Sequence, residues 1–364
     1  MITDREIARW RLHSQHLAGA GLDGATDVVS HLLGVQAENY GQASWAVATR
    51  TTGLTEADFA QVFDAGDILR THVLRPTWHF VDPNDIRWLL DLTAPRIRAR
   101  CRALQRELDL DDAELDRAAG HVVEALTPGT HLTRAALGER LAEEGLPSEG
   151  RELGLIAAHA ELSGLICSGA VQDGHHTYAL LDGRAPEARR LDRDEALAEL
   201  ALRYVSGHGP ATARDLAYWA TLTLTDARKG LAAVADALGS FDHDGRTFWF
   251  ATSDPGGPIE SRAHLLQIFD ESYRGYQDSR RVLDADGHLP PGREASVGTV
   301  LIDGQYAGTM RRTLGASTVT FEVSPCRDLD RSELSALQDA AARYGRFLGL
   351  APEVSLEGPA TATG

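Results

Sequence analysis

Two consecutive segments of the chain predict the same order of secondary-structure elements. Residues 113–163 and 194–238 each contain three stretches with apolar residues at helical spacing, and a pair of short strands follows each segment. The turns 127–133 and 206–212 both precede the second helix of their segment. Such a correspondence is hard to obtain by chance, and it indicates tandem copies of one small unit.

The N-terminal part follows a related plan of helices and then a hairpin. The helices are expected over residues 3–17, 25–33, 44–51 and 55–63. Thr3 and Glu6 form a capping box, and β-branched and aromatic residues predict the hairpin at 68–81. We therefore expect a mainly α fold with small β-hairpins, built from tandem winged-helix domains. Such domains place a helix in a DNA groove, but they also serve as protein-interaction scaffolds.

The expected domains divide the chain into five parts. They are an N-terminal winged-helix-like domain with the candidate site (1–110), a second winged helix (111–190), a third winged helix (191–252), a C-terminal region of helix and β-hairpin (259–352) and a disordered tail (353–364). The Pro- and Gly-rich stretch 252–258 predicts a linker. Asp82 and Pro83 predict the start of a long helix, as its N-cap and its first residue.

The formal net charge of -17 argues against indiscriminate binding to nucleic acid, which depends on a large positive field. A local basic face is still compatible with it, because arginine supplies all basic residues but Lys229 and suits bidentate phosphate contacts. The 3 cysteines are odd in number, far apart and without a Cys-x-x-Cys pair, so neither a disulfide framework nor a cysteine zinc site is indicated. His13 and His16 lack a third ligand, so we expect no metal. No apolar run is long enough to span a membrane, and we expect a cytoplasmic protein.

The chain contains no phosphate loop, dinucleotide fingerprint, Gly-x-Ser-x-Gly elbow or His-Glu-x-x-His helix, which argues against several enzyme classes. A small reactive site is instead suggested where two glycines bracket polar residues after an apolar run. Gln36 and Glu38 are two residues apart, so in an extended loop both side chains lie on one side while the residue between them turns into the core. An amide and a carboxylate held together in this way can position and deprotonate water. An ordinary loop is the alternative, with Gln36 capping local backbone and Glu38 paired with Arg50 or Arg75.

Further motifs accompany this stretch along nearly the whole chain. They are residues 29–50 around Gln36, the Arg-Thr-His and Arg-Pro-Thr-Trp-His strands within 70–81, 209–212 with Asp215 and Trp219, 269–271 with Gly275 and Tyr276, 303–304 with Gly308 and Thr309, and 342–349. Together they resemble the winged-helix DNA glycosylases of the AlkZ/YcaQ type, which excise bulky N-alkylated purines and unhook interstrand crosslinks. The departures from the family pattern are Glu38 in place of Gln or Asp, Pro76 in place of Gly, Met310 in place of Trp, and Tyr273-Arg274 in place of Leu-Leu.

The resemblance implies a monofunctional, metal-independent DNA glycosylase that uses no cofactor. Gln36 would hold the attacking water, and Glu38 would activate it and stabilise the oxocarbenium-like sugar. The residues expected to contact DNA or to lie near the lesion are Asn39, His72, Arg75, Trp78 and His79. The residues expected to hold the DNA backbone are Arg274, Arg280, Arg311 and Arg312.

The expected partner is double-stranded DNA that carries alkylated or crosslinked purines, bound by a monomer in the cytoplasm at the nucleoid. The resemblance suggests self-protection against a genotoxic metabolite as the physiological role. Two alternatives stay open. One is a tandem winged-helix DNA-binding or regulatory protein that has lost the chemistry, and the other is a winged-helix protein-interaction scaffold, which the acidic charge favours.

Overall fold

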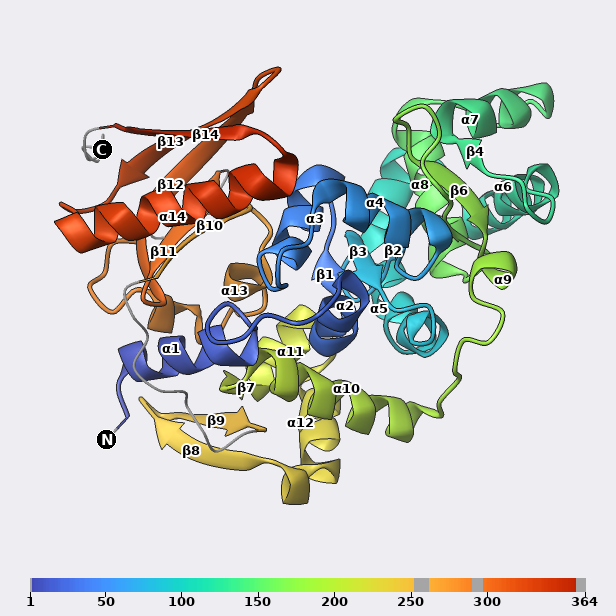
Figure 1. The fold of residues 1–364 in the computed structure, drawn as a ribbon. Coiled ribbons are helices and arrows are strands. Elements are labelled where there is room, and N and C mark those ends of the chain that lie inside the picture. Colours follow the sequence, from blue (N-terminus) through green and yellow to red (C-terminus); the bar gives the residue numbers. More distant parts are fainter. Residues whose placement is uncertain (1, 252–261, 290–296, 358–364) are drawn as a thin grey trace.

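The computed structural model describes residues 2–251, 262–289 and 297–357, and three units within them share one order of elements (Figure 1). Each unit runs helix, short strand, two helices and two strands, and the last strand lies between the other two in each sheet. The repeat that the sequence predicts is therefore confirmed, and it extends to the N-terminal unit. The mainly α fold with small β-hairpins is confirmed as well.

The units follow one another along the chain. The first consists of α2 (Ala25–Leu32), β1 (Val35–Gln36), α3 (Tyr40–Ala48), α4 (Glu56–Ala65), β2 (Leu69–His72) and β3 (Trp78–Val81). The second consists of α6 (Asp112–Ala125), β4 (Leu132–Thr133), α7 (Arg134–Glu143), α8 (Gly150–Leu162), β5 (Ile166–Ser168) and β6 (Thr177–Leu180). The third consists of α10 (Arg193–His208), β7 (Ala211–Thr212), α11 (Ala213–Trp219), α12 (Leu224–Ala233), β8 (Gly239–His243) and β9 (Arg246–Phe250). The remaining helices before residue 290 are α1 (Asp4–Ser14), α5 (Ile86–Glu107), α9 (Leu181–Arg184), η1 (Ala235–Ala237), α13 (Glu271–Arg274) and η2 (Arg280–Leu283).

Local capping chemistry sets several helix starts, and it corrects one prediction. The capping box of Thr3 and Glu6 begins α1 as expected. The sequence predicts Asp82 as the N-cap of α5, but the Asp82 carboxylate instead accepts the Asn84 N–H at 2.8 Å and closes a turn. Helix α5 therefore begins later, after Asp85.

The C-terminal region is a five-stranded sheet with α14 (Arg331–Leu348) packed on one face (Figure 1). Its strands, in spatial order, are β10 (Ala263–Leu266), β11 (Gly298–Ile302), β12 (Gln305–Leu314), β13 (Thr318–Pro325) and β14 (Ala351–Leu356). The disordered tail expected over 353–364 is wrong for 353–356, because these residues pair with β13 in parallel. Residues 358–364 and the expected linker 252–258 lie outside the described residues.

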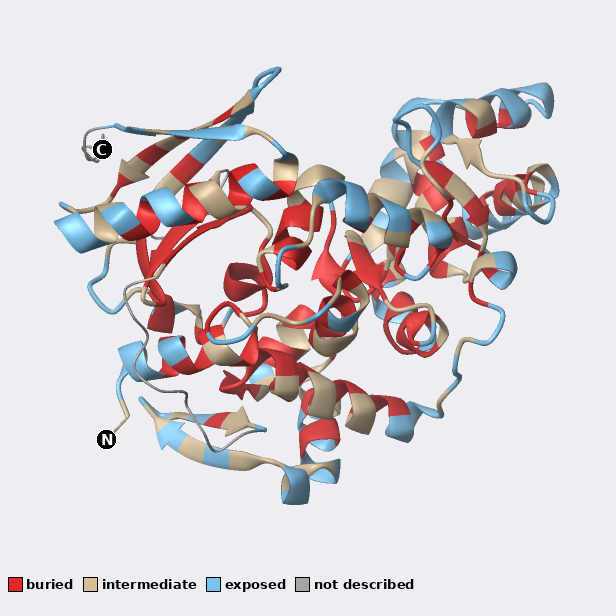
Figure 2. Cartoon of the chain, viewed as in Figure 1, coloured by how far each residue is buried: buried red, intermediate tan, exposed pale blue. Residues whose placement is uncertain are grey.

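The first unit and the C-terminal sheet pack together through α3. The Trp45 ring stacks on the Tyr344 ring of α14, with centroids 4.0 Å apart. The Trp45 Nε1–H also donates to the Leu265 carbonyl of β10 at 2.8 Å. Figure 2 shows buried residues gathered in the middle of the molecule, around β1 and α13. Among the described residues, no helix is long and apolar enough to cross a lipid bilayer.

A buried ion pair ties the end of α3 to the residue that precedes α13. The Arg50 guanidinium donates to both carboxylate oxygens of Asp270 at 2.9 Å each. Arg50 also donates to the Ala46 carbonyl and to the Gln15 side-chain oxygen. Both charged side chains are 1% exposed. Removing either partner would therefore leave the other charge buried without compensation.

We expect Arg50→Met to lower the free energy of unfolding by about 3–5 kcal/mol, because the Asp270 carboxylate would be stranded in the interior. Urea denaturation followed by circular dichroism measures this change. Arg5→Met is the control, since Arg5 and Asp286 form an ion pair whose side chains are both 46% exposed, and no measurable change is expected there. Equal effects of the two substitutions would contradict the role assigned to the buried pair.

Candidate active site

Strand β1 brings Gln36 into the middle of the molecule. Gln36 pairs with His79 of β3, and the next N–H, that of Ala37, donates to the Trp78 carbonyl at 2.7 Å. The chain then leaves the sheet, and Asn39 becomes the N-cap of α3. A two-residue strand followed at once by a capped helix fixes this segment at both ends.

Of the two candidate catalytic residues, only Glu38 lies at the surface. Ala37 is fully buried, as the spacing predicts, but Gln36 is also buried and only 5% exposed. Within the described part of the chain, the Glu38 carboxylate makes no hydrogen bond or ion pair; its residue is held through the backbone carbonyl alone. The alternative in which Glu38 pairs with Arg50 or Arg75 is wrong, because both arginines bind other carboxylates.

Gln36 belongs to a buried polar cluster centred on Glu271, which is fully buried. The Gln36 N–H donates to Glu271 Oε1 at 3.0 Å. Arg75 Nη2 donates to the Gln36 side-chain oxygen at 3.0 Å and to Glu271 Oε1 at 3.4 Å. The Trp219 Nε1–H donates to Glu271 Oε2 at 2.7 Å, and His208 Nε2 lies 3.4 Å from the same oxygen. Burial alone would raise the pKa of Glu271, but the Arg75 charge and His208 outweigh it and hold that pKa below its ordinary value.

Two residues expected at the DNA are instead part of this interior. Arg75 is 7% exposed, and its Nη1 donates to the Trp219 carbonyl at 3.2 Å, so its guanidinium is used within the fold. His79 is fully buried beneath the hairpin, and its Nδ1 lies 3.0 Å from the Thr77 carbonyl. Burial and the Arg75 charge lower the pKa of His79 to about 3, which keeps the imidazole neutral. Both side chains are therefore used within the fold, and their expected place near DNA or the lesion stays a prediction.

A second polar cluster supports the segment from the other side. His72 and Trp78 both bind the buried Glu161 carboxylate of α8, Trp78 through its Nε1–H at 3.2 Å. Arg70 lies over the Trp78 ring and donates to the Ala37 carbonyl at 2.9 Å and to the next carbonyl at 3.3 Å. Sequence reasoning left Arg70 out of the site, although it opens the Arg-Thr-His motif of β2.

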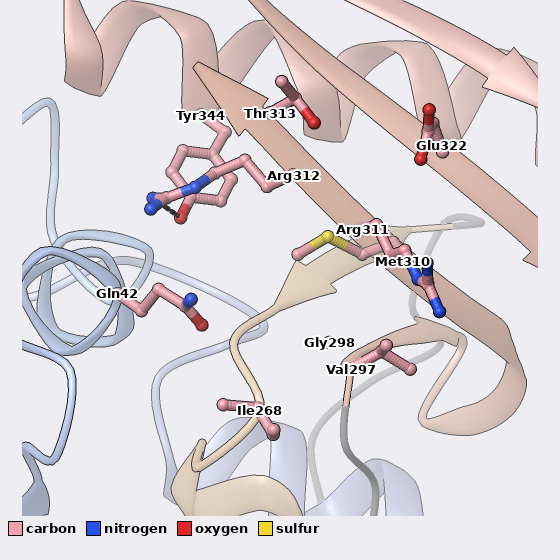
Figure 3. A pocket seen from close by; sticks show the side chains of 10 residues that line it. All are labelled: Gln42, Ile268, Val297, Gly298, Met310, Arg311, Arg312, Thr313, Glu322 and Tyr344. Carbon is pink, nitrogen blue, oxygen red and sulfur yellow. Dashed lines mark hydrogen bonds between the residues drawn. The ribbon is translucent and has the colours of Figure 1, made fainter.

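Beside this segment lies a groove of about 480 Å³ between α3 and the C-terminal sheet (Figure 3). Its lining residues are Gln42, Ile268, Val297, Gly298, Met310, Arg311, Arg312, Thr313, Glu322 and Tyr344. Arg311 is exposed, and Arg312 is half-buried and donates to the Tyr344 hydroxyl at 2.6 Å. Gln42 is in the first turn of α3, whose N-cap directly follows Glu38. The segment that carries Glu38 therefore leads into the helix whose Gln42 lines the groove.

The two other arginines expected on the DNA backbone contribute to the fold. Arg274 is 5% exposed, and its guanidinium lies over the Phe269 ring with 5.0 Å to the centroid, so its expected DNA contact stays a prediction. Arg280 is half-buried, and its Nε–H donates to the carbonyls of Tyr273 and Tyr276. Their motif was visible in the sequence, but the direction of each side chain follows from packing between α13 and η2.

The site combines the buried amide of Gln36, the exposed carboxylate of Glu38 and a groove with two arginines, an arrangement suited to hydrolysis on an anionic polymer. Comparison with known proteins gives the class of protein. The family model for DNA glycosylase AlkZ-like proteins matches residues 29–347. The chain therefore belongs to the AlkZ-like DNA glycosylase family. It is 25% identical to the interstrand DNA cross-link repair glycosylase of Streptomyces sahachiroi, over 95% of this chain and 96% of the relative. The solved structure of Streptomyces sahachiroi DNA glycosylase AlkZ has the same fold, with a TM-score of 0.81 and 22% identity over 98% of this chain and 100% of that one.

The neutral state of His79 makes stability depend on pH in a defined direction. In the folded protein its pKa is about 3, below the ordinary value of 6.5, so the unfolded chain binds the proton first as pH falls. The stability that the neutral His79 ring contributes is complete above pH 6.5 and is lost progressively as the pH falls to about 3. At pH 5 the loss amounts to about 2 kcal/mol. The charged and titratable groups that act on the His79 ring are Arg75, Glu271 and His72. The substitution tested below leaves these three residues unchanged.

We expect His79→Gln to flatten the fall in the free energy of unfolding between pH 7 and pH 5, because glutamine does not titrate. Urea denaturation of both proteins at several pH values in this range measures the slope. Parallel curves for the wild type and the variant would show that His79 is not the titrating group.

Proposed function

We propose that this DNA glycosylase hydrolyses the N-glycosidic bond of bulky N-alkylated purines in double-stranded DNA and unhooks interstrand crosslinks. The observation that carries the proposal is the exposed, unpaired carboxylate of Glu38 two residues after the fixed amide of Gln36, in the segment that leads into α3. The relative from Streptomyces sahachiroi is an interstrand DNA cross-link repair glycosylase, which supports the same lesion class.

The proposed chemistry assigns separate tasks to the two residues. An N7-alkylated purine is already cationic, so it leaves readily and positive charge develops on the sugar. The Glu38 carboxylate stabilises that charge and accepts a proton from the attacking water, while Gln36 orients the water. The extra methylene of glutamate relative to the aspartate of the family pattern moves the carboxylate by about one C–C bond, which the exposed position of Glu38 can accommodate.

Water is the proposed nucleophile because the single lysine side chain of the sequence is already ion-paired. Its only lysine, Lys229 of α12, is paired with Asp194 of α10, in the third unit. A glycosylase that forms a Schiff base would need a lysine beside the sugar. This supports a monofunctional reaction that ends with an abasic site and an intact strand.

We interpret the three units as winged helices, which is supported by their common element order and their common sheet order. We further propose that the protein binds duplex DNA as a monomer at the nucleoid, with Arg311 and Arg312 toward the phosphates. Arg311 and Arg312 line this groove together with Glu322, and their local positive charge would allow binding in spite of the net charge of -17. Asn39, His72 and Trp78 are proposed to lie near the lesion, since each is exposed or half-buried.

We expect the wild type to release the base from a duplex with a defined N7-alkylguanine, and Gln36→Ala to release none above background. Denaturing gels that resolve the cleaved abasic product measure the rate. Glu38→Gln removes the carboxylate and should slow release by about 10²-fold or more. Thr52→Ser, at an exposed position outside the cluster, is the control. A wild type that binds the duplex but releases no base would instead support a non-catalytic DNA-binding protein.

We expect Arg311→Gln to weaken duplex binding at every sequence and to reduce the slope of log Kd against log salt by about one, because one phosphate contact is lost. Fluorescence anisotropy across a salt series measures both quantities. Arg117→Gln is the matched control, since Arg117 is an exposed arginine on α6 in the second unit. The same slope for Arg311→Gln and the wild type would remove this groove from the DNA interface.

A further inference from the structure

The hydrogen bonds around Gln36 determine which end of its amide is available. Arg75 Nη2 lies 3.0 Å from the Gln36 side-chain oxygen. A guanidinium has only donors, so the oxygen and not the NH₂ group must face Arg75. Among residues 2–251, 262–289 and 297–357, the Gln36 NH₂ group has no hydrogen-bond partner. Its nitrogen is not one of the polar atoms that are fully buried without a partner, so it stays accessible. The amide therefore offers its two N–H groups to a ligand.

We infer that Gln36 acts in the reaction as a hydrogen-bond donor, and that Glu271 and Arg75 are the positioning residues that fix this donor. The inference rests on the proposed function and deepens it. It differs from a role in which the Gln36 oxygen accepts a hydrogen bond from the water, because that oxygen faces Arg75 while the NH₂ group is the end of the amide that has no partner.

The Glu271 carboxylate binds both the Gln36 backbone N–H and Arg75, which is the hydrogen-bond partner of the Gln36 side chain. One carboxylate oxygen accepts the Gln36 N–H at 3.0 Å and the Arg75 guanidinium at 3.4 Å. The other oxygen accepts the Trp219 indole N–H at 2.7 Å. Because Glu271 is fully buried, these donors are not exchanged for water. Rotation of the Gln36 amide would break its bond to Arg75 and place two N–H groups against a guanidinium.

The neighbouring carboxylate restrains the other end of the same segment. Asp270 binds Arg50, which lies two residues after the end of α3. Glu271 binds Gln36, which lies before α3. Two consecutive acidic residues thus hold residues 36–50 from both ends. Displacement of a reacting group by about 1 Å can cost on the order of 10²-fold in rate. A double restraint of this kind is what a fixed donor requires.

The donor role gives a balanced hydrolytic step. A Gln36 N–H donates to one lone pair of the water, and the water donates one O–H to the Glu38 carboxylate. The second lone pair forms the bond from oxygen to the sugar C1′, while the C1′–N bond breaks and its electron pair leaves with the purine. The water proton passes to Glu38. Neither an oxidant nor a further co-reactant is needed.

Gln36→Glu tests the donor directly, because it keeps an oxygen for Arg75 and removes both N–H groups. We expect single-turnover base release from an N7-alkylguanine duplex to fall by about 10²-fold or more, with duplex Kd close to the wild-type value. The added carboxylate beside Glu271 is expected to lower the melting temperature, so the rates are compared at a temperature at which both proteins are folded. A Gln36→Glu rate equal to or above that of the wild type would overturn the inference while leaving the proposed function intact. A wild type that releases no base would overturn both.

A second set of variants separates positioning from stability. Arg75→Met and Glu271→Gln each leave a buried charge without its partner, and both should lower the melting temperature. The double variant removes both charges, and we expect it to recover melting temperature but not the rate of base release. Recovery of the rate together with the melting temperature would overturn the positioning role and leave the pair with a structural one.

Discussion

The arrangement of the site depends on two carboxylates that are buried next to each other in the chain, Asp270 and Glu271. Each is compensated by an arginine from the first unit, Arg50 or Arg75. A buried charge costs several kcal/mol unless it is paired and hydrogen-bonded, so the first unit and the α13 region cannot separate without a large penalty. Through this constraint, residues from opposite halves of the chain define the position of a single amide.

The local parts of this structure could be predicted from the sequence, because they depend on residues near one another. The capping box of Thr3 and Glu6 and the hairpin at 68–81 are of this kind. The family resemblance identified Gln36 and Glu38 as candidates, and their catalytic roles remain a prediction. The contact of Arg75 with Glu271 joins positions 196 residues apart, and no periodicity encodes such a pair.

The same limit explains why the sequence could not show which arginines reach the surface. Arginines were expected at DNA because guanidinium suits phosphate, yet Arg75 and Arg274 are used inside the fold. Composition indicates which chemistry a chain carries, whereas packing decides which side chains reach the surface. Arg311 and Arg312 remain at the groove, adjacent to the helix that follows Glu38. The net charge of -17 makes this local concentration important for any association with DNA.

The central claim is that a fixed donor from Gln36 and a free carboxylate from Glu38 meet at the reacting sugar. The most direct measurement is a crystal structure of the protein bound to duplex DNA that carries a cationic pyrrolidine in place of the target sugar. We predict the pyrrolidinium nitrogen beside the Glu38 carboxylate, and an ordered water between Glu38 and the Gln36 NH₂ group. An analogue bound elsewhere, or a Gln36 amide turned so that its oxygen faces the water, would contradict the account.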